Sequence, residues 1–386
     1  MMKRTNWLIV VGIALGLLVP AVAAYASPAT ARLFFVSSFL RFRSPSDRPV
    51  DLTVFLNDEG VVTLRDDFGR ITPGPGCVAV SPREVECDHP AAGEVDFVGS
   101  YQFENLVRLQ FAPPRGFSGL GGASDDQFFG QSSNDRFQGN AGDDELHGRG
   151  GEDDLSAYDG ADRLFGGSGN DRLELDSLES PDEPDEVSGG HGVDQVRYGS
   201  TDETLRVSLN DIADDGVAGE HDNVLSDVED VLGSHGDDVL EGDGDDNQLG
   251  GQSGDDVLIG GGGNDALGGR RGDDRLVGDQ GNDRLFGWED QDDLFGSRGD
   301  DMLRGGEDHD DLFGHRGDDA LDGEEGNDSL TGGDGHDDLF GRGGSDHLDT
   351  VDDVADRADC GAGIDVATVD ALDQVSASCE TVNVIA

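Results

Sequence analysis

The sequence predicts an all-β fold, a parallel β-roll (β-solenoid) of nonapeptide repeats with a small N-terminal β module and a disulfide-closed C-terminal cap. Three observations predict it. Glycine, aspartate and a large apolar residue recur every nine residues over about half of the 386 residues. Glycine is abundant, with 61 residues, and only 6% of residues are aromatic, a composition that would suggest disorder if it had no period. The formal net charge of −58 also opposes compaction unless a counter-ion is bound.

The repeat falls into frames of nine residues. Frames begin at residues 121, 130, 139, 148, 157 and 166, again at 189, and then run without a break over 233–349. Position 1 is glycine except at Ala157, position 6 is aspartate except at Asn247, and position 8 is leucine throughout 233–349. Internal repetition of this kind indicates stacked structural units.

One unit, GGEDHDDLF at 305–313, shows how the period folds. Its glycine-rich half can turn tightly through positive φ angles. Asp310 and Leu312 are two residues apart and point to the same side of an extended segment, whereas Asp311 and Phe313 point to the other. Each unit therefore gives a loop and a short strand. Two units make one coil, and coils stack as parallel strands about 4.8 Å apart.

Stacking places the position-6 carboxylates of alternate units above one another, and each pair repels by about 1 kcal/mol in water and several times more at a protein-like dielectric. A core one side chain thick does not offset this, so a cation must lie between the loops. Carboxylate and loop carbonyl oxygens are ligands that calcium accepts at flexible angles, whereas magnesium demands near-ideal octahedra. The predicted calcium ligands are Asp126, Asp135, Asp144, Asp153, Asp162, Asp171, Asp194, Asp238, Asn247, Asp256, Asp265, Asp274, Asp283, Asp292, Asp301, Asp310, Asp319, Asp328, Asp337 and Asp346.

Two of these sites are expected to bind more weakly. Asn247 keeps an oxygen but loses the charge. The stretch around Asp162 lacks the opening glycine, because Ala157 stands there.

Two units, GGSGNDRLE at 166–174 and GGGGNDALG at 260–268, match every fixed position of GGxGxDxUx, where U is a large apolar residue. On these residues the chain resembles the hemolysin-type calcium-binding nonapeptide repeat of RTX proteins. The resemblance implies a parallel β-roll with calcium between successive turns, bound by position-6 aspartates and loop carbonyls, and folding that depends on calcium. The chain differs from well-known RTX exoproteins in its N-terminal signal and in the short stretch before the repeats, which argues against toxin activity.

Residues 1–26 have the features of a secretory signal peptide: Lys3 and Arg4, an apolar stretch, and a small-x-small cleavage site ending at Ala26. The alternative is a retained membrane anchor, because the apolar stretch approaches spanning length. The other segments are the N-terminal β module (27–118), the first repeat array (119–174), an irregular insert with one repeat at 189–197 (175–232), the second repeat array (233–349) and the C-terminal cap (350–386). Within the module, strands are expected in 50–60 and 61–67, and a strand-turn-strand in 76–87.

The four cysteines form two pairs that are local in sequence, Cys77 with Cys87 and Cys360 with Cys379. An exported chain meets an oxidising compartment, so disulfides are expected. Four cysteines allow three connectivities, of which we favour the local one. Neither pair has the CxxC spacing of a zinc site.

The acidic excess disfavours nucleic acid and anionic membrane surfaces and favours cations. We expect a secreted, extracellular calcium-binding protein with a structural or surface-interaction role, no enzymatic activity, and an extracellular protein or glycan partner still to be identified.

A nucleophile elbow is missing, since GFSGL at 116–120 is one glycine short of G-x-S-x-G. The alternatives are a calcium-dependent extracellular enzyme or toxin-like exoprotein with a short active module, a membrane-anchored spacer, and a disordered acidic chain that buffers ions.

Two further sets of residues stand out. His309 and His336 fill the same repeat position and are expected to face solvent rather than bind a transition metal. Four phenylalanines occupy position 9, an outward slot, where they form either a binding patch or a surface packed against the cap. They are Phe286, Phe295, Phe313 and Phe340.

Overall fold

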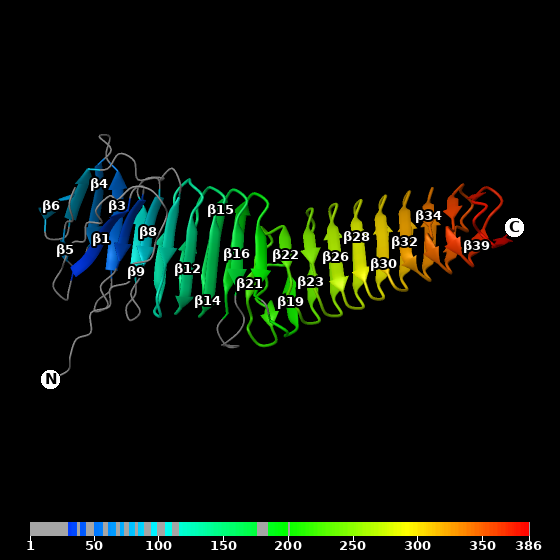
Figure 1. Cartoon of the computed structure of the whole chain (residues 1–386), viewed down its shortest axis with the longest axis horizontal. Coiled ribbons are helices and arrows are strands. Elements are labelled where there is room, and N and C mark those ends of the chain that lie inside the picture. The colour runs from blue at the N-terminus through cyan, green and yellow to red at the C-terminus, as the bar shows by residue number, and fades with distance from the viewer. Residues whose placement is uncertain are drawn as a thin grey trace, which may run out of the picture.

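The computed structural model describes residues 116–175, 184–199 and 201–385 with their side chains, together with the backbone of strands between residues 30 and 109. In these parts every regular element is a strand, so the predicted all-β class is confirmed. The strands stack into one long parallel roll, with the earliest strands at one end and the last coil at the other (Figure 1). No helix of the described residues is long and apolar enough to cross a membrane.

Three sheets make up the roll. Sheet A has 20 strands and runs along its whole length, whereas the opposite wall is divided between sheet B, with 10 strands, and sheet C, with 11. Sheet A contains β1 (Thr30–Val36), β2 (Phe39–Arg43), β5 (Arg70–Thr72), β8 (Glu94–Val98), β10 (Phe117–Leu120), β12 (Arg136–Ala141), β14 (Asp154–Asp159), β16 (Arg172–Leu175), β18 (Gln195–Tyr198), β22 (Asp230–Leu232), β24 (Gln248–Gly250), β26 (Ala266–Arg271), β28 (Arg284–Glu289), β30 (Met302–Glu307), β32 (Ala320–Gly326), β34 (Asp338–Phe340), β35 (Gly343–Gly344), β37 (Arg357–Asp359), β38 (Ala362–Gly363) and β40 (Gln374–Val375).

The opposite wall is built from the alternate strands. Sheet B contains β3 (Val50–Leu56), β4 (Val61–Asp66), β6 (Cys77–Ser81), β7 (Glu84–Asp88), β9 (Asn105–Leu109), β11 (Asp126–Phe129), β13 (Glu145–His147), β15 (Arg163–Ser168), β17 (Glu186–His191) and β21 (Asn223–Val224). Sheet C contains β19 (Leu205–Ser208), β20 (Gly216–Val217), β23 (Val239–Glu241), β25 (Val257–Gly262), β27 (Arg275–Gln280), β29 (Asp293–Arg298), β31 (Asp311–Arg316), β33 (Ser329–Asp334), β36 (His347–Asp349), β39 (Val366–Val369) and β41 (Thr381–Val384).

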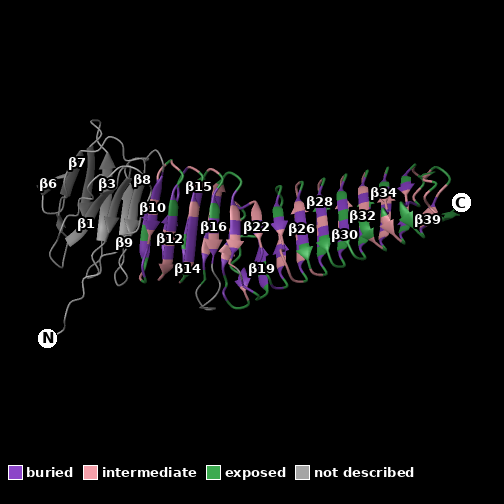
Figure 2. Cartoon of the chain, in the orientation of Figure 1, coloured by how far each residue is buried: buried purple, intermediate pink, exposed green. Residues whose placement is uncertain are grey.

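The register within the arrays confirms that two nine-residue units form one coil. Leu294 lies opposite Leu312, and Leu312 lies opposite Leu330, in parallel strand pairs offset by 18 residues. The position-8 leucines of both sheets point inward and are fully buried. Along each strand, buried and more exposed positions alternate (Figure 2). The core is therefore one continuous stack of apolar side chains, leucine throughout the second array and phenylalanine or valine in parts of the rest.

The strands before residue 116 continue the two walls. β8 pairs in parallel with β10, and β9 pairs in parallel with β11. Antiparallel pairs lie further out, β3 with β4, β4 with β7, and β7 with β6. The strands expected in 50–60, 61–67 and 76–87 are thus present. The register places Cys77 opposite Cys87, while their predicted disulfide lies outside the described side chains.

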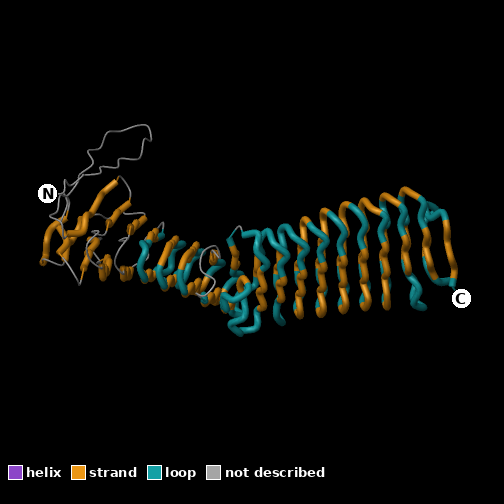
Figure 3. The backbone as a smooth tube through the Cα atoms, turned by 90° about the horizontal axis from the view of Figure 1, so that it is seen from below, coloured by secondary structure: helices purple, strands orange, loops and turns teal. Residues whose placement is uncertain are grey.

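Sheets B and C meet at a seam in the irregular insert. Here the Asp215 carboxylate accepts a hydrogen bond from the Ser208 amide of β19, at 2.7 Å, and another from the Val224 amide of β21, at 2.8 Å. Because β19 belongs to sheet C and β21 to sheet B, one buried side chain joins the two half-walls. Figure 3 shows loops gathered between the two runs of regular strands. Sheet A continues past the seam through β18 and β22.

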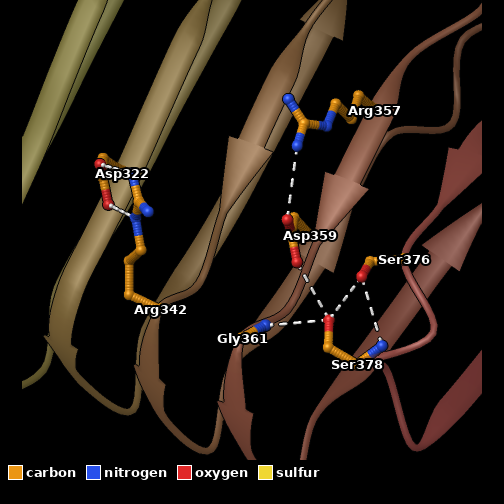
Figure 4. A network of polar contacts seen from close by, with 7 residues as sticks. All are labelled: Asp322, Arg342, Arg357, Asp359, Gly361, Ser376 and Ser378. Carbon is orange, nitrogen blue, oxygen red and sulfur yellow. Dashed lines mark hydrogen bonds and ion pairs between the residues drawn. The ribbon is translucent and has the colours of Figure 1, made fainter.

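The last coils are fastened by a covalent bond and a polar network. Cys360 and Cys379 form a disulfide, as predicted. The Ser378 hydroxyl accepts a hydrogen bond from the Gly361 amide and lies 3.1 Å from Asp359 Oδ1 (Figure 4). These contacts tie the chain after β40 back to the preceding coil, with the Arg342–Asp322 ion pair nearby.

Candidate calcium sites

The predicted ligands form two buried rows, one along each wall. All twenty position-6 residues have relative exposures of 3% or less. Those that precede sheet A strands, such as Asp283 and Asp301, make row A. Those that precede sheet B or sheet C strands, such as Asp292 and Asp310, make the opposite row. Burial follows from the pattern, because position 6 lies on the same side of the chain as the core leucine at position 8.

One oxygen of each carboxylate stacks the coils. The Asp292 amide donates to Asp310 Oδ1 at 2.9 Å, and the Asp310 amide donates to Asp328 Oδ1 at 3.1 Å. The same contact recurs through both arrays, for example from Asp135 to Asp153 at 2.6 Å. A hydrogen bond to a charged acceptor is roughly twice as strong as a neutral one. The Oδ1 atoms of the aspartates therefore link each coil to the next.

The other oxygen, Oδ2, has no such partner at most positions. It is buried without a hydrogen bond at Asp144, Asp153, Asp171, Asp194, Asp256, Asp265, Asp274, Asp283, Asp292, Asp301, Asp310, Asp319, Asp328, Asp337 and Asp346. Leaving a buried charged acceptor unsatisfied is costly. These fifteen atoms, most of them in successive units, mark positions at which a cation would be stabilised.

The position-1 glycine leaves room for this oxygen. A Cβ built on Gly314 would collide with Asp319 Oδ2 of its own unit and lie 2.7 Å from the Gly332 carbonyl oxygen of the next coil. Gly130 has the same two kinds of neighbour, Asp135 Oδ2 and the Gly148 carbonyl, the latter at 2.6 Å. The missing Cβ thus opens a recess lined by one carboxylate oxygen and one carbonyl oxygen.

The glycine-rich half of the unit turns through positive φ angles, as predicted, but the position-1 glycine takes no part in this turn. The positive φ angles of the loop fall at positions 2 and 4, as at Arg270 and Gly272, and not at the nearly invariant position 1. Position 2 adopts this strained conformation even with large side chains, including Trp288 and His315. Position 1 is glycine because of the space required by the aspartate.

The recess fits calcium. Its donors are oxygens alone, from a carboxylate and from the backbone, and calcium takes six to eight oxygens at flexible angles. Within the described residues no three His, Cys, Asp or Glu side chains gather around one point. The carboxylates are instead spaced singly along each row, with carbonyls between them. His309 and His336 are exposed, in agreement with the expectation that they face solvent.

Burial changes the proton affinity of the rows. Desolvation raises the pKa of Asp144 to about 9, of Asp256 to about 8 and of Asp310 to about 7, from 3.8. Neighbouring carboxylates add to the rise, as Asp162 does for Asp144. A carboxylate held in this way binds a proton near neutral pH when no metal ion neutralises it.

Asn247 lies in row A at the position that aspartate has in the other units, but its side-chain amide makes different hydrogen bonds from those of the aspartates. Its Oδ1 accepts a hydrogen bond from the Asp243 amide at 2.9 Å, and its Nδ2 lies 3.4 Å from the Glu229 carbonyl oxygen. The recess beside Gly242 therefore faces an amide oxygen rather than a carboxylate. Weaker calcium binding at this site, and around Asp162, stays a prediction.

Both rows contain acidic residues that the nonapeptide pattern missed. Asp185 and Asp222 extend the opposite row, where Asp222 accepts from the Asp185 amide at 3.0 Å. Glu229 accepts from the Asp194 amide at 2.8 Å and carries row A across the insert. Near the C-terminus the further members are Asp356, Asp365, Asp373 and Glu380. Their spacings of 15 to 37 residues differ from 18, and only the alternation of an acidic residue with an apolar one two places later signals some of them.

The sequence matches one known family. The RTX calcium-binding nonapeptide repeat (4 copies) matches residues 120–155, 147–177, 232–267, 268–303, 289–321 and 315–348. These matches cover both arrays and leave the insert between them. No curated protein matches the sequence. RTX nonapeptide repeats bind calcium ions, and the parallel β-roll is the fold that the repeats predicted. The two arrays are therefore RTX-type repeats that form a parallel β-roll, and calcium is the ion that they bind.

Proposed function

We propose that the protein is a secreted, non-enzymatic structural element of the extracellular space, which folds when it meets calcium there. The observation that carries this proposal is the file of buried Oδ2 atoms, each in a glycine recess. Such a file is unfavourable in a compact chain until cations occupy it, so binding and folding are the same event.

The compartment follows from affinity. Extracellular calcium modules commonly have dissociation constants of about 10⁻⁴ to 10⁻³ M, so sites of this class are empty inside a cell and filled outside. The Cys360–Cys379 disulfide supports an oxidising compartment. The predicted signal peptide, residues 1–26, lies outside the described residues. The mass of the mature N-terminus, measured on protein purified from the culture medium, tests export and cleavage together.

The proposed role is that of a stiff, acidic, calcium-loaded rod that spaces or presents other surfaces. The long parallel stack supports it, since each coil contacts only its neighbours and length grows with coil number. An absence of enzymatic activity is part of this proposal. A hydrolase screen of the pure calcium-loaded protein tests it, and turnover of any substrate that a boiled sample lacks would contradict it.

Far-UV circular dichroism of the mature chain during a calcium titration, with magnesium as the control, tests the folding switch. We expect a cooperative gain of β signal with calcium alone. Full β signal in a metal chelator, or an equal response to magnesium, would show that calcium does not drive folding. A signal that stays that of a disordered chain at about 10 mM calcium, well above the range of such sites, would favour the ion-buffering alternative.

A further inference from the structure

The outward face of sheet A has a gap in its row of position-9 side chains. Leu232, Gly250, Gly268 and Phe286 are successive members of this row on β22, β24, β26 and β28. The two glycines interrupt the row between an aliphatic and an aromatic side chain, and they leave room above the strands for Trp288, which covers Gly268. Three strand spacings, about 14 Å, separate the backbones of Leu232 and Phe286.

Two adjoining hollows occupy this part of the surface. One, of about 230 Å³, lies over the glycine floor and is lined by Leu232, Gly250, Gly268, Phe286 and Trp288, with polar side chains at its rim. The other, of about 730 Å³, continues across the loop edge of the same coils. Trp288 and Arg270 line both, so the hollows form one trough that crosses several coils.

Trp288 is fixed as a platform in this trough. A Cβ on Gly268 would lie only 2.5 Å from the indole, so the ring rests directly on the glycine. Phe286 stacks beside it, with ring centroids 5.4 Å apart and planes 24° apart, and the Arg304 guanidinium lies 5.9 Å from the centre of the Phe286 ring. Even so, 46% of Trp288 stays exposed. An indole braced in this way presents its surface at little cost in side-chain entropy.

The polar groups of the smaller hollow are amides and a guanidinium group, whereas the larger hollow also has carboxylates. Gln195, Gln248 and Arg270 line the smaller hollow, and Gln252 lines the larger one. These groups donate and accept hydrogen bonds in several directions, as hydroxyl-rich ligands require. An apolar ring surface with a few such groups is the usual composition of a binding site.

The charge of the trough selects the kind of ligand. The protein as a whole carries −58, which repels polyanions. Within the trough, however, Arg270 and Arg271 stand among the acidic residues, and Arg271 pairs with Glu289 at 3.0 Å. Two arginines against Glu289, Glu307 and Glu324 leave the larger hollow close to neutral, which weakens the attraction for cations that the rest of the surface has. A neutral ligand is opposed neither by the net charge of the protein nor by the charges that line the trough.

We propose that this trough binds an unbranched, neutral oligosaccharide segment, with a pyranose ring stacked on Trp288 and its hydroxyl groups bonded to Gln248 and Arg270. The C–H groups of a pyranose face pack on the indole, while the equatorial hydroxyl groups reach the amide and guanidinium groups at the rim. The open, elongated shape suits a chain of sugars rather than one compact molecule. Saccharide binding would be a second function beside calcium binding. It requires the coils to be folded but uses none of the calcium-binding aspartates.

Intrinsic fluorescence of the calcium-loaded protein tests the site directly. The sequence has two tryptophans, and cleavage after Ala26 removes Trp7, so Trp288 is the only indole of the mature protein; Trp7→Phe gives the same in a chain that keeps residues 1–26. The probes are cellohexaose, laminarihexaose, maltohexaose and chitohexaose, with hexagalacturonate as the charged comparison. We expect saturable quenching or a blue shift with at least one neutral hexasaccharide and none with hexagalacturonate. No saturable change with any neutral probe, while circular dichroism shows the folded roll, overturns the proposal without touching calcium-dependent folding.

Two variants separate the trough from the rest of the surface. Gly250→Val fills the floor, and it is compatible with the fold because the nearest atom to its Cβ is the flexible end of Leu232 at 2.9 Å and no positive φ is required. It should weaken binding at least tenfold. Phe313→Ala is the matched control, since Phe313 is a position-9 aromatic on sheet C that stacks on Phe295, away from the trough. It should leave binding unchanged.

A third measurement excludes another occupant. Sedimentation of the calcium-loaded protein shows whether a second copy covers the trough. We expect Gly250→Val to leave the oligomeric state unchanged. Loss of a dimer in that variant, or equal loss of sugar binding in Phe313→Ala and Gly250→Val, would overturn the assignment of the trough to a saccharide.

Discussion

The backbone amide of Asp292 donates a hydrogen bond to Oδ1 of Asp310, one coil further along, at 2.9 Å. Oδ2 of the same Asp310 carboxylate is buried without a hydrogen-bond partner beside Gly305. One side chain therefore has two separate tasks: one oxygen stacks the coils, and the other faces the metal recess. Substitutions that affect one task and spare the other are available, and they distinguish a structural aspartate from a ligand.

Asp310→Asn is expected to remove about one calcium site while keeping the fold. An amide has only one oxygen, so the variant loses either the acceptor of the Asp292 N–H or, unlike Asn247, the oxygen that faces the recess, and it loses the negative charge in both cases. Isothermal titration should show a lower calcium stoichiometry, and the midpoint of calcium-induced folding should rise. Asp311→Asn is the matched control, because Asp311 is the adjacent, exposed residue on the outward face. An equal effect of both variants would mean that only total charge matters.

Asn247→Asp should act in the opposite direction. It restores the carboxylate at the one position of the second array that lacks it. We expect a gain of about one calcium ion per molecule and a lower calcium concentration at the folding midpoint. The readout is again the titration. Unchanged stoichiometry would show that Asn247 already binds calcium as well as an aspartate does, or that the recess beside Gly242 is not a site.

Gly305→Ala should damage a site although alanine favours the backbone conformation. The added Cβ would collide with Asp310 Oδ2, and position 1 does not need a positive φ. Overpacking of this kind costs about 1–3 kcal/mol. Thermal unfolding in calcium should therefore show a lower midpoint. Gly262→Ala is the control, because its Cβ would meet nothing closer than 3.5 Å, and its melting temperature should stay equal or rise slightly. A lower midpoint in both variants would refute the role of the recess.

Acid should replace calcium in part. Desolvation raises the pKa of Asp144, Asp256 and Asp310 to about 9, 8 and 7 in the folded state, whereas the unfolded value is 3.8. Because these carboxyl groups have a higher pKa in the folded chain than in the unfolded one, the calcium-free fold is most stable below pH 3.8, where they are protonated in both states. Its free energy of unfolding falls as the pH rises through the pKa values of the folded state. We expect the chelator-treated protein to gain β signal on acidification from about pH 8 to 4.

A salt control separates buried from surface carboxylates in this experiment. Salt at about 1 M screens exposed charges and leaves buried ones nearly unaffected. Salt at pH 8 should therefore fail to reproduce the effect of acid. Calcium affinity should also fall with decreasing pH, because protons and calcium compete for the same oxygens. Restoration of the fold by salt alone would place the repulsion on the surface.

The Cys360–Cys379 disulfide should stabilise the last coils and leave the middle of the roll unaffected. The two cysteines are 19 residues apart, and closing a loop of this length contributes roughly 3 kcal/mol. In the double variant Cys360→Ser/Cys379→Ser, hydrogen exchange should accelerate in β39 and β41 and stay unchanged in β27. Exchange that accelerates equally in all three strands would show that the roll unfolds as one unit.

Much of the architecture could be predicted from the sequence because a repeat imposes the same geometry many times. The period of nine, the leucine at position 8 and the aspartate at position 6 sufficed for the coils, the core and the twenty buried ligand candidates. The role of the position-1 glycine was less accessible. Glycine is needed at Gly305 because a Cβ there would collide with Asp310 Oδ2, and the amino-acid sequence does not show how close these two atoms lie.

The remaining members of the rows were hidden by variable loops. Glu229 stands where row A crosses the insert, 35 residues after Asp194 rather than 18. The intervening chain makes the seam, so no fixed period could find it. The trough was hidden for a related reason, because Gly250 and Gly268 look like two more glycines until register places them side by side between Leu232 and Phe286.

The seam has a mechanical consequence. Sheet A is unbroken from end to end, whereas the wall facing it changes from sheet B to sheet C where Asp215 holds β19 against β21. A rod in which one wall is continuous and the other is interrupted bends most easily at the interruption. The bend is directed towards or away from the continuous wall. Two stiff arms would thus be joined by a directional hinge, to whose resistance the Asp215 carboxylate and its two amide partners contribute.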